Sequence, residues 1–148
     1  MNQSSRSEMI IEEVIIQAGA DRVFAALTSA EERVKWWGAE GRFKTEHTES
    51  DLRPGGKWLM RGIGVGGRPF TIQGVYREIE RPRLLAFTWL PSWQAEAVET
   101  LVRIELLEQD GVTTVRLTHS GLTDSSRAAH KGWPDVLAWL RAHVEGRS

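Results

Sequence analysis

The middle of the chain is a series of strand-like segments with no helical stretch between them. These segments are residues 42–47, 57–61, 70–80, 84–90, 99–108 and 113–119. The turns between them are rich in glycine and proline, as at residues 53–56, 62–67 and 110–111, which is typical of hairpins. Because strands joined by such short connections pair antiparallel, this block predicts one antiparallel sheet.

Another strand and two short helices are predicted before this block. Residues 8–17 are rich in isoleucine and valine, which favours a strand. Residues 20–28 have apolar side chains at helical spacing and predict a short helix. Ser29 is a suitable N-cap for a second short helix, which we expect to end at residues 36–38.

The C-terminal region, residues 124–145, predicts a long helix. Its apolar residues recur on one face, at Trp133, Val136, Leu137, Leu140 and Val144. Pro134 removes a backbone donor, so we expect a kink or a new helix start there. A sheet with one apolar face must bury that face, and the long helix is the largest element available to cover it. We therefore expect one α+β domain over residues 1–148, with an ordered core over 8–146 and a flexible N-terminus over 1–7.

Composition and charge exclude several classes of protein. A net charge of −1 argues against a broad nucleic-acid surface. The chain has no apolar run near the roughly 20 residues that a membrane span needs, and its polar first residues do not resemble a signal peptide. The absence of cysteine excludes disulfides, thiolate metal sites and cysteine nucleophiles. We therefore expect a cytoplasmic protein.

Tryptophan dominates the aromatic residues, with seven against one tyrosine and four phenylalanines. Two interpretations stay open: these side chains fill the core, or several of them line a cavity for an apolar ligand. Trp93, in a polar loop, and Trp139, outside the apolar face of the last helix, are candidates for exposed contact residues.

The strand pattern selects candidate cavity residues. Trp58 and Met60 share one strand face, Phe87 and Trp89 share another, and Trp37 and Trp133 are expected near opposite ends of a cavity. The predicted ligand-binding residues are Trp37, Trp58, Met60, Phe87, Trp89, His119 and Trp133. The glycine-rich residues 62–67 form a hairpin loop that gates entry if it lies at the cavity mouth.

Histidine offers one candidate for chemistry. The chain has four histidines, but none forms a local pair with metal-ligand spacing, so no metal site is expected. The chain also has no nucleotide fingerprint or haem motif, and no cofactor is expected. Period-two alternation places His119 on the same inner face as Val115 and Leu117. His119 is therefore either a hydrogen-bonded core residue or a polar anchor that binds a ligand carbonyl or moves a proton.

Several short motifs, taken in order, resemble those of a known family. They are VFAALT at 23–28, WWG at 36–38, DLRPGGKW at 51–58, GVYREI at 74–79, PRLL at 82–85, THSG at 118–121 and GW at 132–133. Together they resemble the START-like (SRPBCC) superfamily, in the branch named for the C-terminal domain of activators of the heat-shock protein 90 ATPase. The resemblance covers roughly residues 9–144. It implies a helix-grip fold, in which a curved antiparallel sheet wraps around the long C-terminal helix and leaves a deep cavity.

The resemblance leaves more than one function open, because this superfamily includes lipid carriers, hormone-binding proteins, cyclases, hydrolases and co-chaperones. The leading hypothesis is a small soluble protein that binds an apolar or amphipathic small molecule. One alternative is a cyclase- or hydrolase-type enzyme that uses His119, although no catalytic group is evident beyond it. Another is a chaperone-associated protein-binding module, for which the separate N-terminal domain of the eukaryotic activators is missing. A homodimer is also left open.

Overall fold

The computed structural model describes residues 8–39, 43–92, 99–122 and 132–146. The predicted flexible N-terminus over residues 1–7, Trp93 and the predicted helical residues 124–131 lie outside this part of the chain. The described elements are β1 Glu8–Ile16, α1 Ala20–Thr28, α2 Ala30–Trp36, β2 Gly38–Ala39, β3 Phe43–Ser50, β4 Lys57–Gly64, a 3₁₀ turn Val65–Gly67, β5 Pro69–Glu80, β6 Leu84–Pro91, β7 Thr100–Gln109, β8 Val112–Leu122 and α4 Trp133–Val144.

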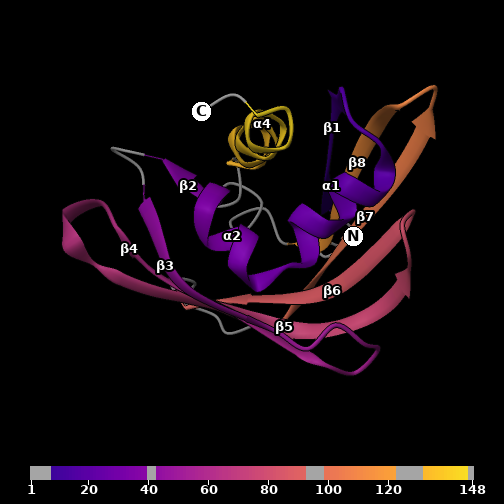
Figure 1. Ribbon diagram of the computed structural model, residues 1–148. Coiled ribbons are helices and arrows are strands. Elements are labelled where there is room, and N and C mark those ends of the chain that lie inside the picture. Colours follow the sequence, from indigo (N-terminus) through magenta and orange to yellow (C-terminus); the bar gives the residue numbers. More distant parts are fainter. Residues whose placement is uncertain (1–7, 40–42, 93–98, 123–131, 147–148) are drawn as a thin grey trace.

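All the strands form an eight-stranded antiparallel sheet in the order β1-β8-β7-β6-β5-β4-β3-β2. The sheet curves around the helices: α1 and α2 lie inside the curve, and α4 lies across its open side (Figure 1). The first strand β1 pairs with the last strand β8, so the first and last strands lie side by side at one edge of the sheet. The predicted α+β class and helix-grip fold are confirmed.

Local signals in the sequence placed the helices correctly. The Ser29 hydroxyl accepts the backbone N–H of Glu32 at 3.2 Å and begins α2, as expected of an N-cap. Pro134 lies in the first turn of α4, which begins at Trp133, as expected of a helix start at this proline. The two-residue strand β2 was not predicted, because so short a segment shows no periodicity.

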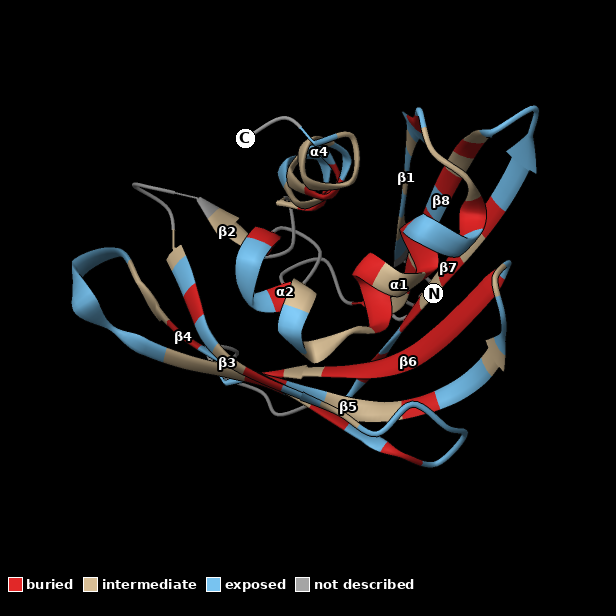
Figure 2. Cartoon of the chain, in the orientation of Figure 1, coloured by how far each residue is buried: buried red, intermediate tan, exposed pale blue. Residues whose placement is uncertain are grey.

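Alternation along the strands directs side chains either into the curve or toward solvent. In β7, Val102, Ile104 and Leu106 are buried, while Arg103 and Glu105 face outward and pair at 3.3 Å. In β8, Val115, Leu117 and His119 are all buried, as predicted. Strand β6 is buried along almost its whole length because it crosses the centre of the sheet (Figure 2).

Two glycines on neighbouring strands leave room for the aromatic rings beside them. A Cβ added at Gly74 would lie 1.9 Å from the carbonyl oxygen of Thr88 and 2.7 Å from the indole nitrogen of Trp58. A Cβ added at Gly62 would lie 2.3 Å from the carbonyl oxygen of Lys44 and 2.7 Å from the ring of Phe70. These distances are far below van der Waals contact, so glycine at each position makes room for its aromatic neighbour.

Among the described residues, no helix is long and apolar enough to cross a membrane.

Candidate functional site: an aromatic cavity

A cavity of about 640 Å³ lies between the β4–β5 hairpin and the start of α4. The described residues that line it are Trp37, Phe43, Gly64, Val65, Arg68, Pro69, Phe70, Ile72, Trp89, Ser92, Gly132, Trp133 and Val136. Val65, Arg68 and Ser92 are exposed and mark the mouth, whereas Trp37, Trp89 and Trp133 are buried and mark the inner end. The lining is therefore apolar inside and polar only where it meets solvent.

Three indoles form the inner wall. Trp37 stacks on Trp89 with ring centroids 6.2 Å apart and meets Trp133 edge-on at 6.1 Å. The ring centroids of Trp89 and Trp133 are 4.9 Å apart. The end of α2, where Trp37 lies, is held to β3 because the Thr45 hydroxyl donates to the carbonyl of Trp37 at 2.6 Å. Because these rings contact one another, the expectation that Trp37 and Trp133 lie at opposite ends of the cavity is wrong: the curved sheet brings the end of α2 and the start of α4 together.

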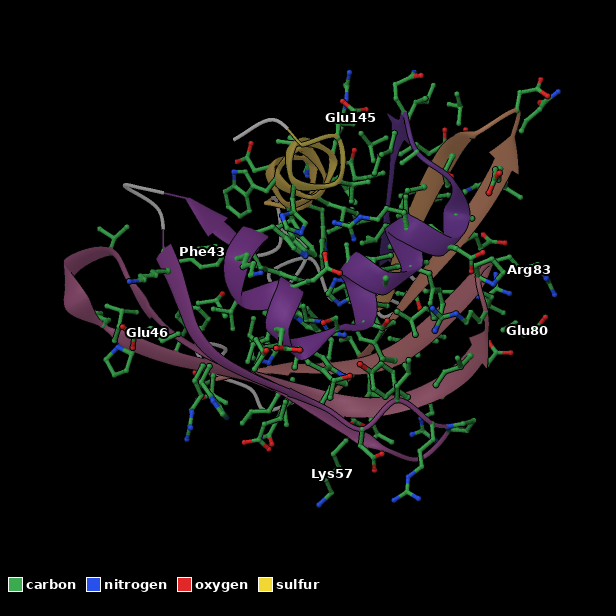
Figure 3. The ribbon with its side chains drawn as sticks, viewed as in Figure 1. Phe43, Glu46, Lys57, Glu80, Arg83 and Glu145 are labelled. Atoms are coloured by element: carbon green, nitrogen blue, oxygen red, sulfur yellow. The ribbon has the colours of Figure 1, made fainter. Side chains whose placement is uncertain are left out.

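The outer wall consists of phenylalanines in edge-to-face contact. Phe43, labelled in Figure 3 at the start of β3, meets Phe70 with centroids 5.3 Å apart. The ring of Phe43 also contacts that of Trp139 of α4, with centroids 5.5 Å apart. Trp139 is therefore half-buried against Phe43, and the suggestion that it is an exposed contact residue is not supported. Phe70 lies across Gly62 and reaches the cavity from β5.

His119 lies behind this inner wall and is fully buried. The indole N–H of Trp133 donates to Nδ1 of His119 at 3.1 Å, and an indole nitrogen cannot accept. The network therefore assigns the proton of a neutral ring to Nε2, which donates to the Thr100 hydroxyl at 2.7 Å. Thr100 in turn donates to the carbonyl of Trp89 at 3.4 Å. His119 thus orients the Trp133 ring and is linked through Thr100 to the backbone of Trp89, and both its nitrogens have protein partners.

The end of the β4–β5 hairpin away from its turn is filled by side chains and adjoins the inner wall, because the ring centroids of Trp58 and Trp89 are 5.8 Å apart. Trp58 meets Phe87 edge-on at 5.2 Å and donates its indole N–H to the carbonyl of Thr88 at 3.2 Å. The guanidinium of Arg33 lies over the Trp58 ring at 5.5 Å. Arg33 also donates to the carbonyl of Leu27 at 2.7 Å and to the Tyr76 hydroxyl at 2.9 Å, while its Nη1 has no hydrogen-bond partner among the described residues.

The structure divides the residues predicted to bind a ligand. Trp37, Trp89 and Trp133 line the cavity. Trp58, Met60, Phe87 and His119 are buried but do not belong to its described lining. The sequence could not separate these groups because alternation gives the direction of a side chain and not what lies opposite it.

Several lining residues were not predicted. Val136 was assigned only to the apolar face of the last helix, and Phe43, Phe70, Ile72 and Arg68 were not selected at all. Gly62, paired with Phe70 across β4 and β5, was the available signal for the outer wall, since a glycine inside a strand often marks a close approach. The glycine-rich loop does lie at the mouth, where Gly64 and Val65 contribute to the lining.

No group of three or more histidine, aspartate or glutamate side chains gathers as a metal site in the described part of the chain.

Comparisons with known proteins point to one family. The family model for Activator of Hsp90 ATPase homolog 1-like protein matches residues 17–145. A crystal structure of a protein from Chromobacterium violaceum is similar with a TM-score of 0.81 at 24% identity, covering 93% of this chain and 97% of the other. An HSP90 activator from Plasmodium falciparum is similar with a TM-score of 0.71 at 19% identity, covering 95% and 97%. An AHSA1-like protein from Aeromonas hydrophila reaches a TM-score of 0.74 at 21% identity, covering 94% and 93%. No curated protein sequence matches significantly.

Proposed function

The chain belongs to the family of Activator of Hsp90 ATPase homolog 1-like proteins, and from that premise and the geometry of its cavity we propose that it binds an apolar or amphipathic small molecule. The observation that carries this proposal is an aromatic cavity of about 640 Å³. Its size lies within the range of roughly 300–1,000 Å³ that is typical of small-molecule sites.

The chemistry of the inner wall supports an apolar ligand. Trp37, Trp89 and Trp133 offer ring surface there, and the indole N–H of Trp133 is already donated to His119. Water in such a place finds few polar partners, so an apolar group that replaces it gains free energy. A planar ring or an alkyl chain would contact these indoles over a large area.

The test is a binding titration followed by tryptophan emission, because three indoles border the cavity. Alkyl and aromatic compounds are expected to shift or quench the emission in a saturable way. Native mass spectrometry of the protein purified from its own host would identify a bound molecule directly. The proposal fails if a wide panel of such compounds leaves the emission unchanged and nothing is retained on purification.

A variant that fills the cavity tests whether binding occurs there. Val136→Phe adds a ring to the lining from α4 and should weaken binding roughly tenfold, equivalent to about 1.4 kcal/mol. Val144→Phe is the matched control, because Val144 is a partly buried residue of the same helix outside the described lining. Equal effects of the two variants on the dissociation constant would place the ligand elsewhere.

A second proposal is a chaperone-associated role, and the comparison favours it because one similar structure is an HSP90 activator. If this chain acts in the same way, it should stimulate the ATPase of the Hsp90-class chaperone of its host. An unchanged ATPase rate at saturating concentrations of the protein would overturn this proposal and leave the ligand-binding proposal intact.

The catalytic alternative gains no support from the position of His119. A general acid or base must reach a substrate atom within hydrogen-bond distance. His119 is fully buried and both its nitrogens are bound to Thr100 and Trp133.

A further inference from the structure

The polar part of the cavity lies at its mouth and consists of side chains that offer hydrogen-bond donors. Arg68 is the one ionisable side chain among the described lining residues. It is exposed, and no ion pair joins it to another residue of the described part of the chain. A guanidinium has five N–H donors and no acceptor, and its planar fork matches a carboxylate.

The second polar side chain at the mouth is Ser92, whose hydroxyl oxygen already accepts one hydrogen bond. The Ser92 hydroxyl accepts the backbone N–H of Thr71 at 2.8 Å, and the Ser92 N–H donates to the Thr71 carbonyl at 2.7 Å. These two bonds fix Ser92 beside β5. Its hydroxyl proton remains able to donate toward the cavity, because a hydroxyl that accepts one bond still has its own O–H.

The backbone holds Arg68 at this place. Gly66 and Gly67 take positive φ angles of 78° and 77°, which turn the chain between β4 and β5. The N–H of Gly64 then donates to the carbonyl of Arg68 at 2.7 Å and closes the hairpin. The β4–β5 hairpin is the loop at the far left in Figure 1, and Arg68 follows directly on its turn. The position of the Arg68 backbone is thus fixed, while its side chain is free to reach a ligand.

We infer that the cavity takes an amphipathic anion, with an apolar body between the aromatic walls and a carboxylate or similar anionic oxygen group at Arg68 and Ser92. This inference rests on the proposed function and specifies its ligand class. An amine is excluded as the favoured head group because no carboxylate of the described lining can balance its charge. A neutral alcohol binds less tightly because it has no negative charge and no second acceptor oxygen to match the guanidinium fork.

The experiment compares three ligands with the same chain, namely decanoate, decanol and decylamine, each below its aggregation concentration. Binding is followed by tryptophan emission and by calorimetry. Decanoate should bind roughly fivefold to tenfold more tightly than decanol, a modest ratio because Arg68 is exposed to solvent. The ratio should shrink as salt is added, since an exposed charge is screened. Decylamine should bind most weakly.

Variants assign this preference to Arg68. Arg68→Gln should weaken decanoate binding much more than decanol binding and so remove the preference for decanoate, and Arg68→Lys should keep part of it. Arg61→Gln is the charge-matched control, because Arg61 is an exposed residue of β4 outside the described lining. It should keep the full preference. An equal loss in Arg61→Gln and Arg68→Gln would overturn the inference, because the effect would then follow net charge alone.

The outcomes separate the inference from the proposal on which it rests. Equal binding of decanoate and decanol overturns the anionic ligand class and leaves the cavity proposal standing. Absence of binding by all three ligands overturns the inference, and the cavity proposal is then decided by the wider panel of compounds and by what is retained on purification. The same anionic group could belong to a membrane lipid, and sedimentation with vesicles that contain an anionic phospholipid tests this source. If the protein binds the vesicles, loses this binding in Arg68→Gln and shows no preference for free decanoate, Arg68 belongs to a membrane-binding surface. That result would overturn the inference.

Discussion

The two ends of the β4–β5 hairpin use the same device with opposite results. At one end Gly74 makes room for the ring of Trp58, and at the other Gly62 makes room for Phe70. The space beside Trp58 is filled by Phe87 and by the guanidinium of Arg33 from α2. The space beside Phe70 is left as a cavity bordered by α4 and the β4–β5 hairpin. An aromatic side chain on the inner face is therefore not by itself a sign of a binding site, since the covering helix decides whether it packs or lines a void.

The largest expected difference between the two ends is in stability. Trp58→Ala should lower the free energy of unfolding by about 3–5 kcal/mol, because it leaves a cavity in a packed region. Phe70→Ala should cost only about 1–2 kcal/mol, because Phe70 is half-buried and already borders open space. Chemical denaturation of both variants measures the contrast. Losses of equal size would show that the two ends are packed alike.

The packed end contains a buried polar network of its own, apart from the one around His119. Tyr76→Phe removes the hydroxyl that accepts from Arg33 and contacts Ser50 at 2.5 Å. The variant leaves Nη2 of Arg33 without its acceptor, and Nη1 already lacks a partner among the described residues. Because the cation is buried, the free energy of unfolding should fall by about 1–3 kcal/mol.

A double-mutant cycle provides the control for this prediction. Arg33→Met removes the buried charge, so adding Tyr76→Phe in that background should cost much less than it does alone. The same loss in both backgrounds, measured by urea unfolding, would contradict the assigned role of Tyr76.

The smallest expected effect belongs to a surface contact that joins three helices. Glu32 of α2 pairs with Arg22 of α1 at 2.8 Å and with His143 of α4 at 2.8 Å. Burial by itself would raise the pKa of Glu32, but the hydrogen bonds from His143 and Arg22 outweigh it and hold this pKa below its ordinary value of 4.5. The ionised carboxylate therefore stabilises the folded state.

The sign of the pH dependence follows from this lowered pKa. A carboxyl group whose pKa is lower in the folded than in the unfolded state stabilises the fold fully at a pH above its pKa in the unfolded state. This stabilisation is lost as the pH falls through the pKa in the folded state. Glu32→Gln should cost less than about 1 kcal/mol at neutral pH, because the pair is partly exposed. The difference from wild type should shrink below about pH 5. A constant difference in unfolding free energy on acidification would rule out this contribution.

Local signals explain why much of the fold was predictable. Ser29 caps α2 and Pro134 starts α4 through contacts within one turn, so neighbouring residues contain the information. The turns between strands and the alternation in β7 are equally local, and they give the antiparallel pairing and the buried face. The division of the tryptophans between core and cavity was not predictable, because Trp58 and Trp89 both point inward and differ only in what covers them.

The sequence by itself therefore determined the order of the described elements other than β2 and which side chains face inward, because these depend on residues close together in the chain. Only the tertiary structure decided that Trp37, Trp89 and Trp133 meet in one wall, since they come from α2, β6 and α4. It also decided that Arg68 lies at the mouth of the cavity and that His119 lies behind its wall. The physical reason is that a cavity is the space left between elements, and its boundary depends on how far the curved sheet stands from the helices that cover it.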